Sequence, residues 1–314
     1  MDNQDRIAIE RSLEKATQSC NLAQAYSDSK EMASLCATAN NEVEHPAWDE
    51  VANRIAKMSD EHIADIIRVG TARFHLLNKA EQLNIIRVNQ QRQRDADSTH
   101  PRAESIEDAL VHLKGLGCTQ ECIVELINDL DIEPTLTAHP TETRRRTILD
   151  KQTEVARCIV RLRDDQLTKR QREETMSELD RIIAMMLMTD EIRAQRLGVE
   201  DEVKNGIYFL TTTIWETVPQ LFRDIVSAAR SAYGSAEAMV VANDLPAILR
   251  YRTWIGGDRD GNPSVTAQVT RQTMTQMRNA AILLWDAQLA NLRHILSVST
   301  RRVDLGIEIH NASS

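Results

Sequence analysis

Apolar residues recur at every third or fourth position along most of the 314-residue chain, which is the spacing of an amphipathic α-helix. The segment from Val203 to Ile225 follows this spacing most regularly. We expect it to form one helix that is kinked at Pro219 and ends near Gly234. Only ten glycines and seven prolines interrupt the chain. The pattern therefore predicts a mainly α-helical protein.

Helix starts can be placed at two polar positions. Ser105, with Asp108 three residues later, predicts the start of a helix that runs to Leu116. Thr168 and Gln171 have the spacing of a capping box, in which each side chain binds the backbone of the other residue. Both helices are expected to be structural.

Polar stretches at residues 89–102 and 231–244 predict loops or linkers. One domain boundary is expected near residue 130. It would divide an N-terminal helical region, residues 1–130, from residues 131–314.

Two short β-prone runs, Pro134–Thr137 and Leu249–Ile255, each lead into a dense polar motif. The first motif, residues 137–146, reads Thr-Ala-His-Pro-Thr-Glu-Thr-Arg-Arg-Arg, and the second, residues 256–263, reads Gly-Gly-Asp-Arg-Asp-Gly-Asn-Pro. A helical pattern follows each motif. Such strand-to-helix corners project side chains into a shared cleft, so both motifs are candidate site segments.

His139 is the candidate catalytic residue of the first motif. An imidazole changes its charge near neutral pH, and three arginines follow it, which suits an anionic substrate. The His-Pro pairs at His45 and His100 lie in polar surroundings and indicate turns. From residue type alone, His139 has a structural alternative, in which a carbonyl at the end of the strand satisfies the ring.

Arg259 lies between Asp258 and Asp260 in a glycine-bounded turn, where the two acids are expected to fix its guanidinium. A structural turn locked by its own ion pairs is the alternative. A calcium loop is excluded, because the glycine is fourth rather than sixth and Val269 occupies the twelfth position. A phosphate-binding P-loop is excluded too, since no Gly-Lys-Ser/Thr follows.

The remaining arginines are less specific. Arg144, Arg145 and Arg146 are about 100° apart on a helix, so they cannot all face one cleft. Arg193 and Arg196 share a helical face and either reach an anion or pair with nearby acids. Those acids are Glu191, Glu200 and Asp201.

Taken together, the two motifs resemble the signature motifs of phosphoenolpyruvate carboxylase, which makes oxaloacetate from phosphoenolpyruvate and bicarbonate. Other segments resemble the same family in the same order: Arg73–Gln82, Thr189–Arg193, Asp201–Glu202 and Ile214–Trp215. The resemblance runs from about residue 70 to about residue 300. It departs from the family at Leu197–Val199, where a proline-containing segment is usual, and this puts the role of Arg196 in doubt.

The resemblance implies that His139 is the catalytic histidine, which assists the breakdown of carboxyphosphate, and that Arg259 binds the anionic substrate. It implies supporting roles for Arg144, Arg145, Arg193, Asp258 and Asp260. The cofactor implied is Mg²⁺ or Mn²⁺, with its ligands beyond residue 314 and none in this chain. The implied fold is mainly α-helical α/β, an incomplete (β/α)-barrel of this family's type with many added helices, in which residues 131–314 form the first part of the catalytic domain.

Charge and hydropathy limit the other function classes. A net charge of -9 argues against a nucleic-acid-binding surface. The acidic start carries no signal peptide, and the longest apolar run, Ile182–Met188, is too short to span a membrane. We therefore expect a soluble, cytoplasmic protein. Five irregularly spaced cysteines are expected to be reduced, and the Cys118/Cys122 pair lacks the second half of a zinc site.

The family's chains are far longer, so this chain resembles their N-terminal third. We expect this piece to be inactive alone. We expect the complete enzyme to be a homo-oligomer. Two other functions stay open. One is a different barrel enzyme that handles enolates or phosphoryl groups, and the other is a catalytically silent helical module that associates with a partner.

Overall fold

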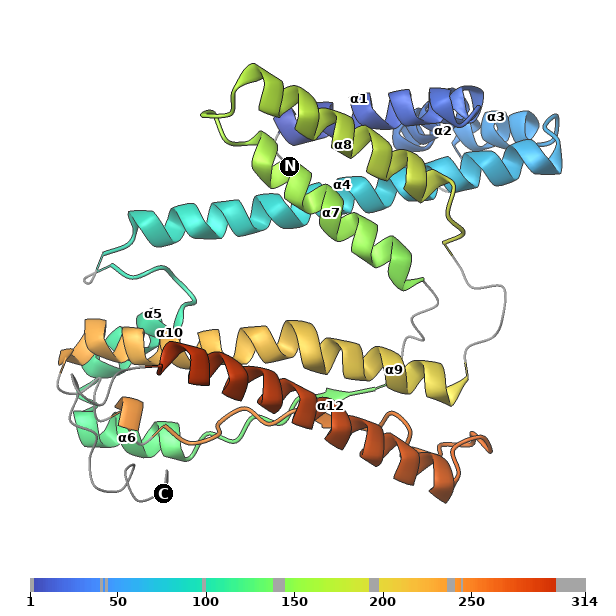
Figure 1. The fold of residues 1–314 in the computed structure, drawn as a ribbon. Coiled ribbons are helices and arrows are strands. Elements are labelled where there is room, and N and C mark those ends of the chain that lie inside the picture. The colour runs from blue at the N-terminus through green and yellow to red at the C-terminus, as the bar shows by residue number, and fades with distance from the viewer. Residues whose placement is uncertain are drawn as a thin grey trace. The chain divides into compact units, whose positions relative to one another are not determined.

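The computed structural model describes residues 3–39, 42, 45–97, 100–137, 145–191, 198–235, 241–243 and 245–297. The protein is mainly α-helical, as predicted, and its described strands form one two-stranded parallel sheet (Figure 1). The chain folds into two compact units, each made of two segments: residues 1–97 with 143–195 form unit 1, and residues 98–142 with 196–314 form unit 2. A domain boundary near residue 130 stays a prediction.

Unit 1 is a helical bundle with one apolar core. Its helices are α1 (Asn3–Ser19), α2 (Ala23–Ala39), α3 (Pro46–Ile55), α4 (Asp60–Asp95), α7 (Arg146–Leu162) and α8 (Lys169–Leu187). Side chains from α1, α4, α7 and α8 meet in the core, where they are fully buried. They include Leu13, Leu76, Val155, Leu179 and Ile183. Apolar stripes at helical spacing therefore find their partners inside this unit.

The two predicted helix starts are confirmed. In α8, the hydroxyl of Thr168 accepts the N–H of Gln171, and the Gln171 side chain accepts the N–H of Thr168. In unit 2, the hydroxyl of Ser105 accepts the N–H of Asp108 at the start of α5 (Ile106–Gly115). Both caps satisfy backbone N–H groups that have no partner within the helix.

The loop expected from residue 89 onward is wrong in its first half, because α4 continues as helix to Asp95. Glutamine and arginine are good helix formers although they are polar. The Gln91 amide also donates to the Asp95 carboxylate at 2.8 Å, one helical turn away. A polar stretch thus extended the helix instead of ending it.

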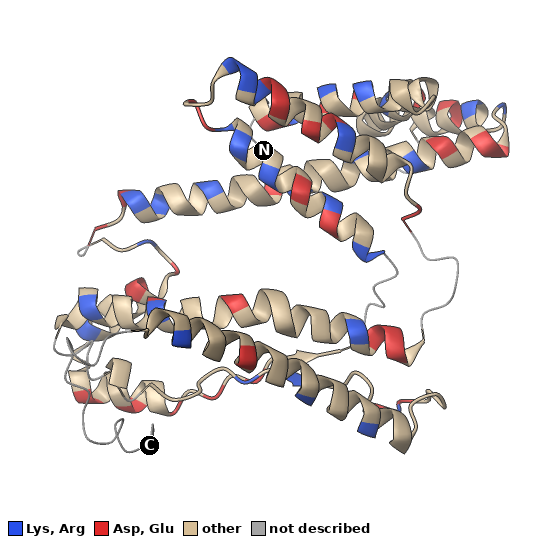
Figure 2. Cartoon of the chain, in the orientation of Figure 1, with Lys and Arg blue, Asp and Glu red and all other residues tan. Residues whose placement is uncertain are grey.

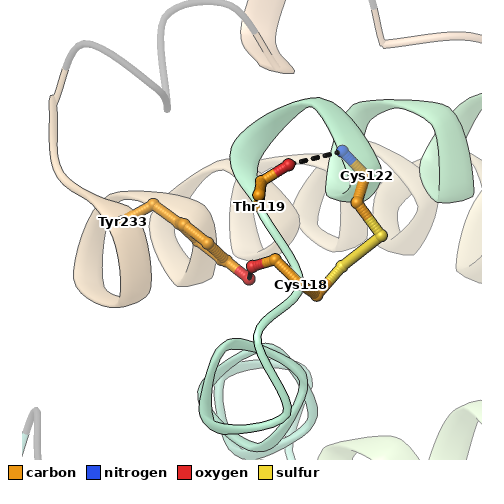
Figure 3. Close-up of a disulfide and its surroundings, with 4 residues drawn as sticks. All are labelled: Cys118, Thr119, Cys122 and Tyr233. Carbon is orange, nitrogen blue, oxygen red and sulfur yellow. Dashed lines mark hydrogen bonds between the residues drawn. A yellow bond between two sulfur atoms is a disulfide. The ribbon is translucent and has the colours of Figure 1, made fainter.

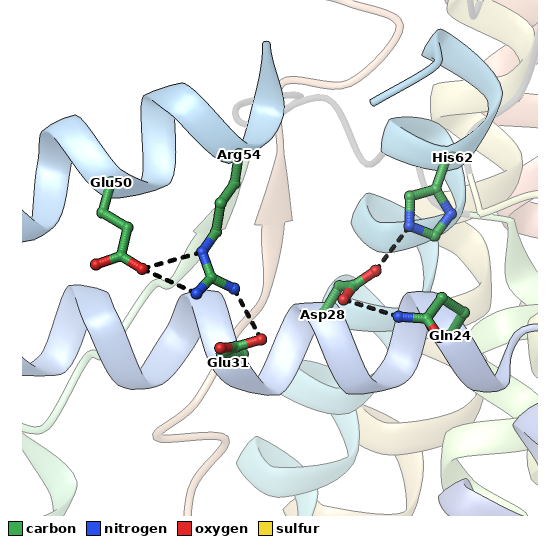
Figure 4. A network of polar contacts seen from close by, with 6 residues as sticks. All are labelled: Gln24, Asp28, Glu31, Glu50, Arg54 and His62. Carbon is green, nitrogen blue, oxygen red and sulfur yellow. Dashed lines mark hydrogen bonds and ion pairs between the residues drawn. The ribbon is translucent and has the colours of Figure 1, made fainter. Parts of the chain in front are cut away.

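Polar contacts tie the outer helices of unit 1 together (Figure 4). The His62 ring on α4 lies 2.8 Å from the Asp28 carboxylate on α2. Arg54 on α3 forms ion pairs with Glu31 on α2 and with Glu50 in its own helix, each at 2.8 Å. These contacts fix how α2, α3 and α4 align within the unit.

A half-buried carboxylate, Glu10 on α1, joins three helices of the same unit. It accepts hydrogen bonds from Arg73 on α4 and from the Tyr26 hydroxyl on α2. Burial acts to raise the pKa of Glu10, but the hydrogen bonds from Arg73 and Tyr26 outweigh it and lower the pKa below its ordinary value.

Unit 2 contains two smaller apolar clusters. Its elements are α5, α6 (Gln120–Asn128), β1 (Thr135–Leu136), α9 (Val199–Phe209), the π-helical turn η1 (Leu210–Ile214), α10 (Trp215–Tyr233), β2 (Arg252–Thr253) and α12 (Ala267–Ile295). One cluster packs α5, α6 and α10 together. The other packs α9 against Ile255 and Val265, which flank the second candidate motif.

The helix expected across Val203–Ile225 is interrupted by a π-helical turn. The chain runs through α9, η1 and α10, so the irregular turn lies just before Pro219. Proline has no N–H to donate to the carbonyl four residues earlier, which is that of Trp215, and this weakens the helical pattern upstream. Gly234 ends α10 with a φ of 116°, as predicted.

The expectation of reduced cysteines is wrong for one pair, because Cys118 and Cys122 form a disulfide. Their Cα atoms lie 5.7 Å apart across the start of α6, within the range that a disulfide spans. The other three cysteines, Cys20, Cys36 and Cys158, are free thiols.

Basic residues lie at the start of α8 and acidic residues follow them along the helix (Figure 2). Lys169 pairs with Glu173 and Arg170 with Glu174, each across one helical turn. Within the described part of the chain, no helix has the length and apolar character that crossing a membrane requires.

Candidate active site

The two candidate motifs leave the same edge of the β1–β2 sheet. The strands are parallel, with Thr135 opposite Arg252 and Leu136 opposite Thr253. Backbone hydrogen bonds of 2.9 Å from Arg252 to Pro134 and from Trp254 to Leu136 set this register. Because the carboxyl ends of parallel strands meet at one edge, residues 137–146 and 256–263 both begin there.

Ion pairs on the amino-terminal side of the strands hold the same register. Arg250 binds Asp131 at 2.6 Å, and Arg252 binds Glu133. The hydrogen bond from Arg250 lowers the pKa of Asp131. All of these groups but the half-buried Glu133 are exposed, so each pair adds little stability. Together they oppose a slip of one strand along the other.

The turn after β2 depends on a glycine. Gly256 has a φ of 75°, and a Cβ at this position would collide with the hydroxyl of Thr273, the buried residue of α12. The N–H groups of Gly257 and Asp258 both donate to the carbonyl of Trp254, at 2.9 and 2.8 Å. Close packing against α12 therefore fixes where the motif turns.

The expected ion pairs around Arg259 are absent from the described part of the chain: neither Asp258 nor Asp260 pairs with its guanidinium. The Asp258 carboxylate instead accepts the N–H of Asp260, and the Asn262 side chain accepts the N–H of Ser264. Short acidic and amide side chains in a tight turn bind their own backbone more easily than they reach a long neighbour. The guanidinium of Arg259 is exposed.

Four residues of interest lie outside the described residues. They are His139, Arg144, Arg193 and Arg196. The structure does describe Leu136 and Thr137, which lead into the first motif at the carboxyl end of β1. The roles of these four residues stay predictions.

Arg145 belongs to unit 1, where it precedes the first residue of α7. Its guanidinium lies 3.7 Å from the Asp190 carboxylate, and its backbone N–H donates to the carbonyl of Glu191. The next arginine, Arg146, is exposed and has a partner of its own. The structure thus brings Arg145 to the segment that follows α8, and Arg259 belongs to the other unit.

One contact escaped the sequence analysis. The His75 ring on α4 lies 2.5 Å from the Glu191 carboxylate, although 116 residues separate them. Both side chains line a cavity of about 580 Å³ in unit 1, together with Arg68, Thr71 and Asp190. Both residues lie in segments that resemble the family, but nothing in the sequence pairs one with the other.

The described residues contain no group of three or more His, Cys, Asp or Glu side chains arranged to hold a metal ion. We assign no chemical step to a metal here.

Comparison with known proteins agrees with the geometry. The family described as phosphoenolpyruvate carboxylase matches residues 3–313. A phosphoenolpyruvate carboxylase of Rhodothermus marinus is 41% identical over 84% of this chain and 28% of its own length. One of Thermus thermophilus is 33% identical over 87% of this chain and 30% of its own length. One of Roseiflexus castenholzii is 36% identical over 84% of this chain and 27% of its own length. The chain spans less than a third of the length of these relatives, and it belongs to the phosphoenolpyruvate carboxylase family.

Proposed function

We propose that this chain supplies the histidine and arginine part of an active site that carboxylates phosphoenolpyruvate with bicarbonate, giving oxaloacetate and phosphate. One observation carries the proposal: β1 and β2 pair in parallel, so the motifs with His139 and Arg259 start from one sheet edge. Catalytic residues gather at such edges because loops from separate strands converge there.

In the proposed reaction, a bicarbonate oxygen attacks the phosphorus, and the bond from phosphorus to the enol oxygen breaks. Carboxyphosphate and an enolate result. His139 then assists the breakdown of carboxyphosphate to carbon dioxide and phosphate, and the enolate carbon attacks carbon dioxide to form oxaloacetate. A ring with an ordinary pKa of about 6.5 is suited to proton transfer at neutral pH.

Arg259 would bind the anionic substrate. Its guanidinium is exposed, and the Asp258 carboxylate accepts the backbone N–H of Asp260. Planar guanidinium groups bind phosphate and carboxylate oxygens through two parallel hydrogen bonds. Supporting roles are proposed for Arg144, Arg145 and Arg193, and Asp258 and Asp260 would shape the turn.

The wider setting is part of the same proposal. β1 and β2 would be the first strands of an incomplete (β/α)-barrel, with residues 131–314 as its first part. Mg²⁺ or Mn²⁺ would bind to ligands outside this chain. The complete enzyme would be a cytoplasmic homo-oligomer.

The test is a chimaera in which residues 3–296 of this chain replace the matching segment of the Rhodothermus marinus relative. We expect His139→Asn to lower kcat by about 100-fold or more, the usual range for general acid–base catalysis, with little change in KM. Arg259→Ala should lower kcat/KM for phosphoenolpyruvate. His45→Asn and Arg170→Ala are the matched controls, because asparagine keeps the cap of α3 and Arg170 is exposed. A near-normal kcat for His139→Asn would contradict the proposal.

The second candidate, a catalytically silent module that associates with a partner, is favoured by α12. This 29-residue helix buries only Thr273 among its described side chains. The isolated chain, supplied with phosphoenolpyruvate, bicarbonate and Mg²⁺, should form no oxaloacetate above background. Turnover by the isolated chain, abolished by His139→Asn, would show that this segment alone is sufficient.

A further inference from the structure

The Cys118–Cys122 disulfide closes a short covalent loop at the start of α6 (Figure 3). Cys118 ends the turn after α5, and Cys122 lies in the first turn of α6, after the N-cap residue Thr119. The Thr119 hydroxyl also accepts the N–H of Cys122, at 3.4 Å. The start of this helix is therefore held twice, once by a covalent bond and once by a hydrogen bond.

The disulfide is accessible from solvent on one side. Cys122 is exposed and Cys118 is half-buried. Cys122 is therefore the sulfur that an external thiol reaches first.

The other cysteines have different surroundings. Cys158 is buried in the core of unit 1, and burial raises the pKa of its thiol to about 11. Cys20 and Cys36 are half-buried free thiols in unit 1. These three cysteines are unpaired and lie in unit 1, so they differ from the disulfide pair in unit 2. They serve as internal references for thiol reactivity.

The disulfide is connected to the core of unit 2 on both sides. The Tyr233 hydroxyl, at the end of α10, donates to the carbonyl of Cys118 at 3.1 Å (Figure 3). Ile123, next to Cys122, is 1% exposed and packs in the cluster shared by α5, α6 and α10. A change at the sulfurs therefore acts directly on the contact between α6 and α10.

We propose that Cys118 and Cys122 are a reversible thiol–disulfide pair that responds to the redox state of its surroundings and sets the rigidity of the start of α6. A dithiol reductant opens the disulfide, and a disulfide oxidant such as oxidised glutathione closes it. The proposal concerns a modification site and is independent of the carboxylase chemistry.

Reduction proceeds by two exchanges. A thiolate of the reductant attacks the Cys122 sulfur, the S–S bond breaks, and Cys118 leaves as a thiolate that takes up a proton. The second thiolate of the reductant then attacks the reductant sulfur that is bonded to Cys122 in the mixed disulfide. This releases Cys122 as a thiolate, which is also protonated. Two electrons and two protons pass to the protein, and the reductant becomes a cyclic disulfide. Oxidation by oxidised glutathione reverses the balance and yields two molecules of glutathione.

The first experiment uses the unmodified 314-residue chain, equilibrated with mixtures of reduced and oxidised glutathione. Accessible thiols are then alkylated and located by mass spectrometry. We expect alkylation of Cys118 and Cys122 to rise together as the mixture becomes more reducing, while Cys158 is alkylated only after unfolding. Two results would overturn the proposal: alkylation of both sulfurs in every mixture, or none after an excess of dithiothreitol without denaturant.

The second experiment measures amide hydrogen exchange in residues 119–127 of the oxidised and reduced chain. We expect faster exchange after reduction in the unmodified protein and in Cys36→Ser, the matched control. In Cys122→Ser the difference between the two conditions should disappear. Equal exchange in the oxidised and reduced unmodified protein would rule out control of this helix by the disulfide.

Discussion

Unit 1 and unit 2 bury their apolar residues to very different degrees. Unit 1 gathers side chains from α1, α4, α7 and α8 into one cluster that includes most of the largest fully buried side chains among the described residues. Unit 2 has two smaller clusters and leaves large apolar side chains of α12 exposed. The exposed residues of α12 include Met274, Leu283, Trp285, Leu289 and Ile295. The unit that carries the candidate site thus has the smaller apolar clusters.

This difference matches the coverage of the relatives, of which the chain spans less than a third. An exposed apolar stripe on a long helix marks a surface that packs against something else. Unit 1 gathers its buried apolar residues into one core, although Ile67, Phe74 and Met188 on its surface are also exposed. Unit 2 brings the site motifs to one edge but does not cover the helix on which the glycine turn packs.

The largest expected effect compares two leucines. Leu179→Ala in unit 1 removes a fully buried side chain and should lower the free energy of unfolding by about 2 to 5 kcal/mol. Leu289→Ala on α12 removes a side chain that is 56% exposed and should cost less than about 0.5 kcal/mol. Amide hydrogen exchange in α8 and in α12, followed as a function of urea concentration, measures the loss of stability in each variant. Equal losses would show that α12 is covered in solution.

The next comparison lies within unit 2. Gly256→Ala adds a Cβ that meets Thr273 at a positive φ, and we expect a loss of about 2 to 4 kcal/mol from overpacking and backbone strain combined. Gly261→Ala has a similar φ but open space, so only the strain of about 1 to 2 kcal/mol applies. Urea unfolding followed by the fluorescence of nearby Trp254 measures both. Similar losses would mean that the turn does not pack on α12.

The smallest effect concerns pH. The pKa of Glu10 is lowered in the folded protein, so its contribution to stability is present above its unfolded pKa and is lost as pH falls through the folded value. Glu10→Gln should therefore reduce the pH dependence of unit 1 stability below about pH 4.5, near the ordinary pKa of glutamate. Glu121 in unit 2 also has a lowered pKa but is fully exposed, so Glu121→Gln should change little. Acid titration of amide exchange in each unit would separate the two cases.

Local features of the fold were predictable from the sequence. Helix caps at Thr168 and Ser105 depend on residues three positions apart, and the strands before both motifs depend on short apolar runs. These signals need no knowledge of the rest of the chain. The length of α4 was not predictable from polarity, because glutamine and arginine favour helix as well as solvent.

Features that depend on distant contacts were not predictable. The pairing of His75 with Glu191 requires the fold of unit 1, and the position of Thr273 against Gly256 requires the packing of α12. The surroundings of Arg259 were misjudged because adjacent opposite charges look like ion pairs in a sequence. In the turn, the Asp258 carboxylate accepts a backbone N–H instead.

The interleaving of the two units has a consequence for the order of folding during synthesis. All residues of unit 1 precede residue 196, whereas β1 pairs with β2. The ion pair of Asp131 with Arg250 beside the strands closes a loop of 119 residues. Ribosomes add about 5 to 20 residues per second, so the first strand stays unpaired for several seconds while the second half of unit 1 emerges. Unit 1 can thus close before the sheet forms. The edge that carries both candidate motifs is then among the last parts of the chain to be assembled.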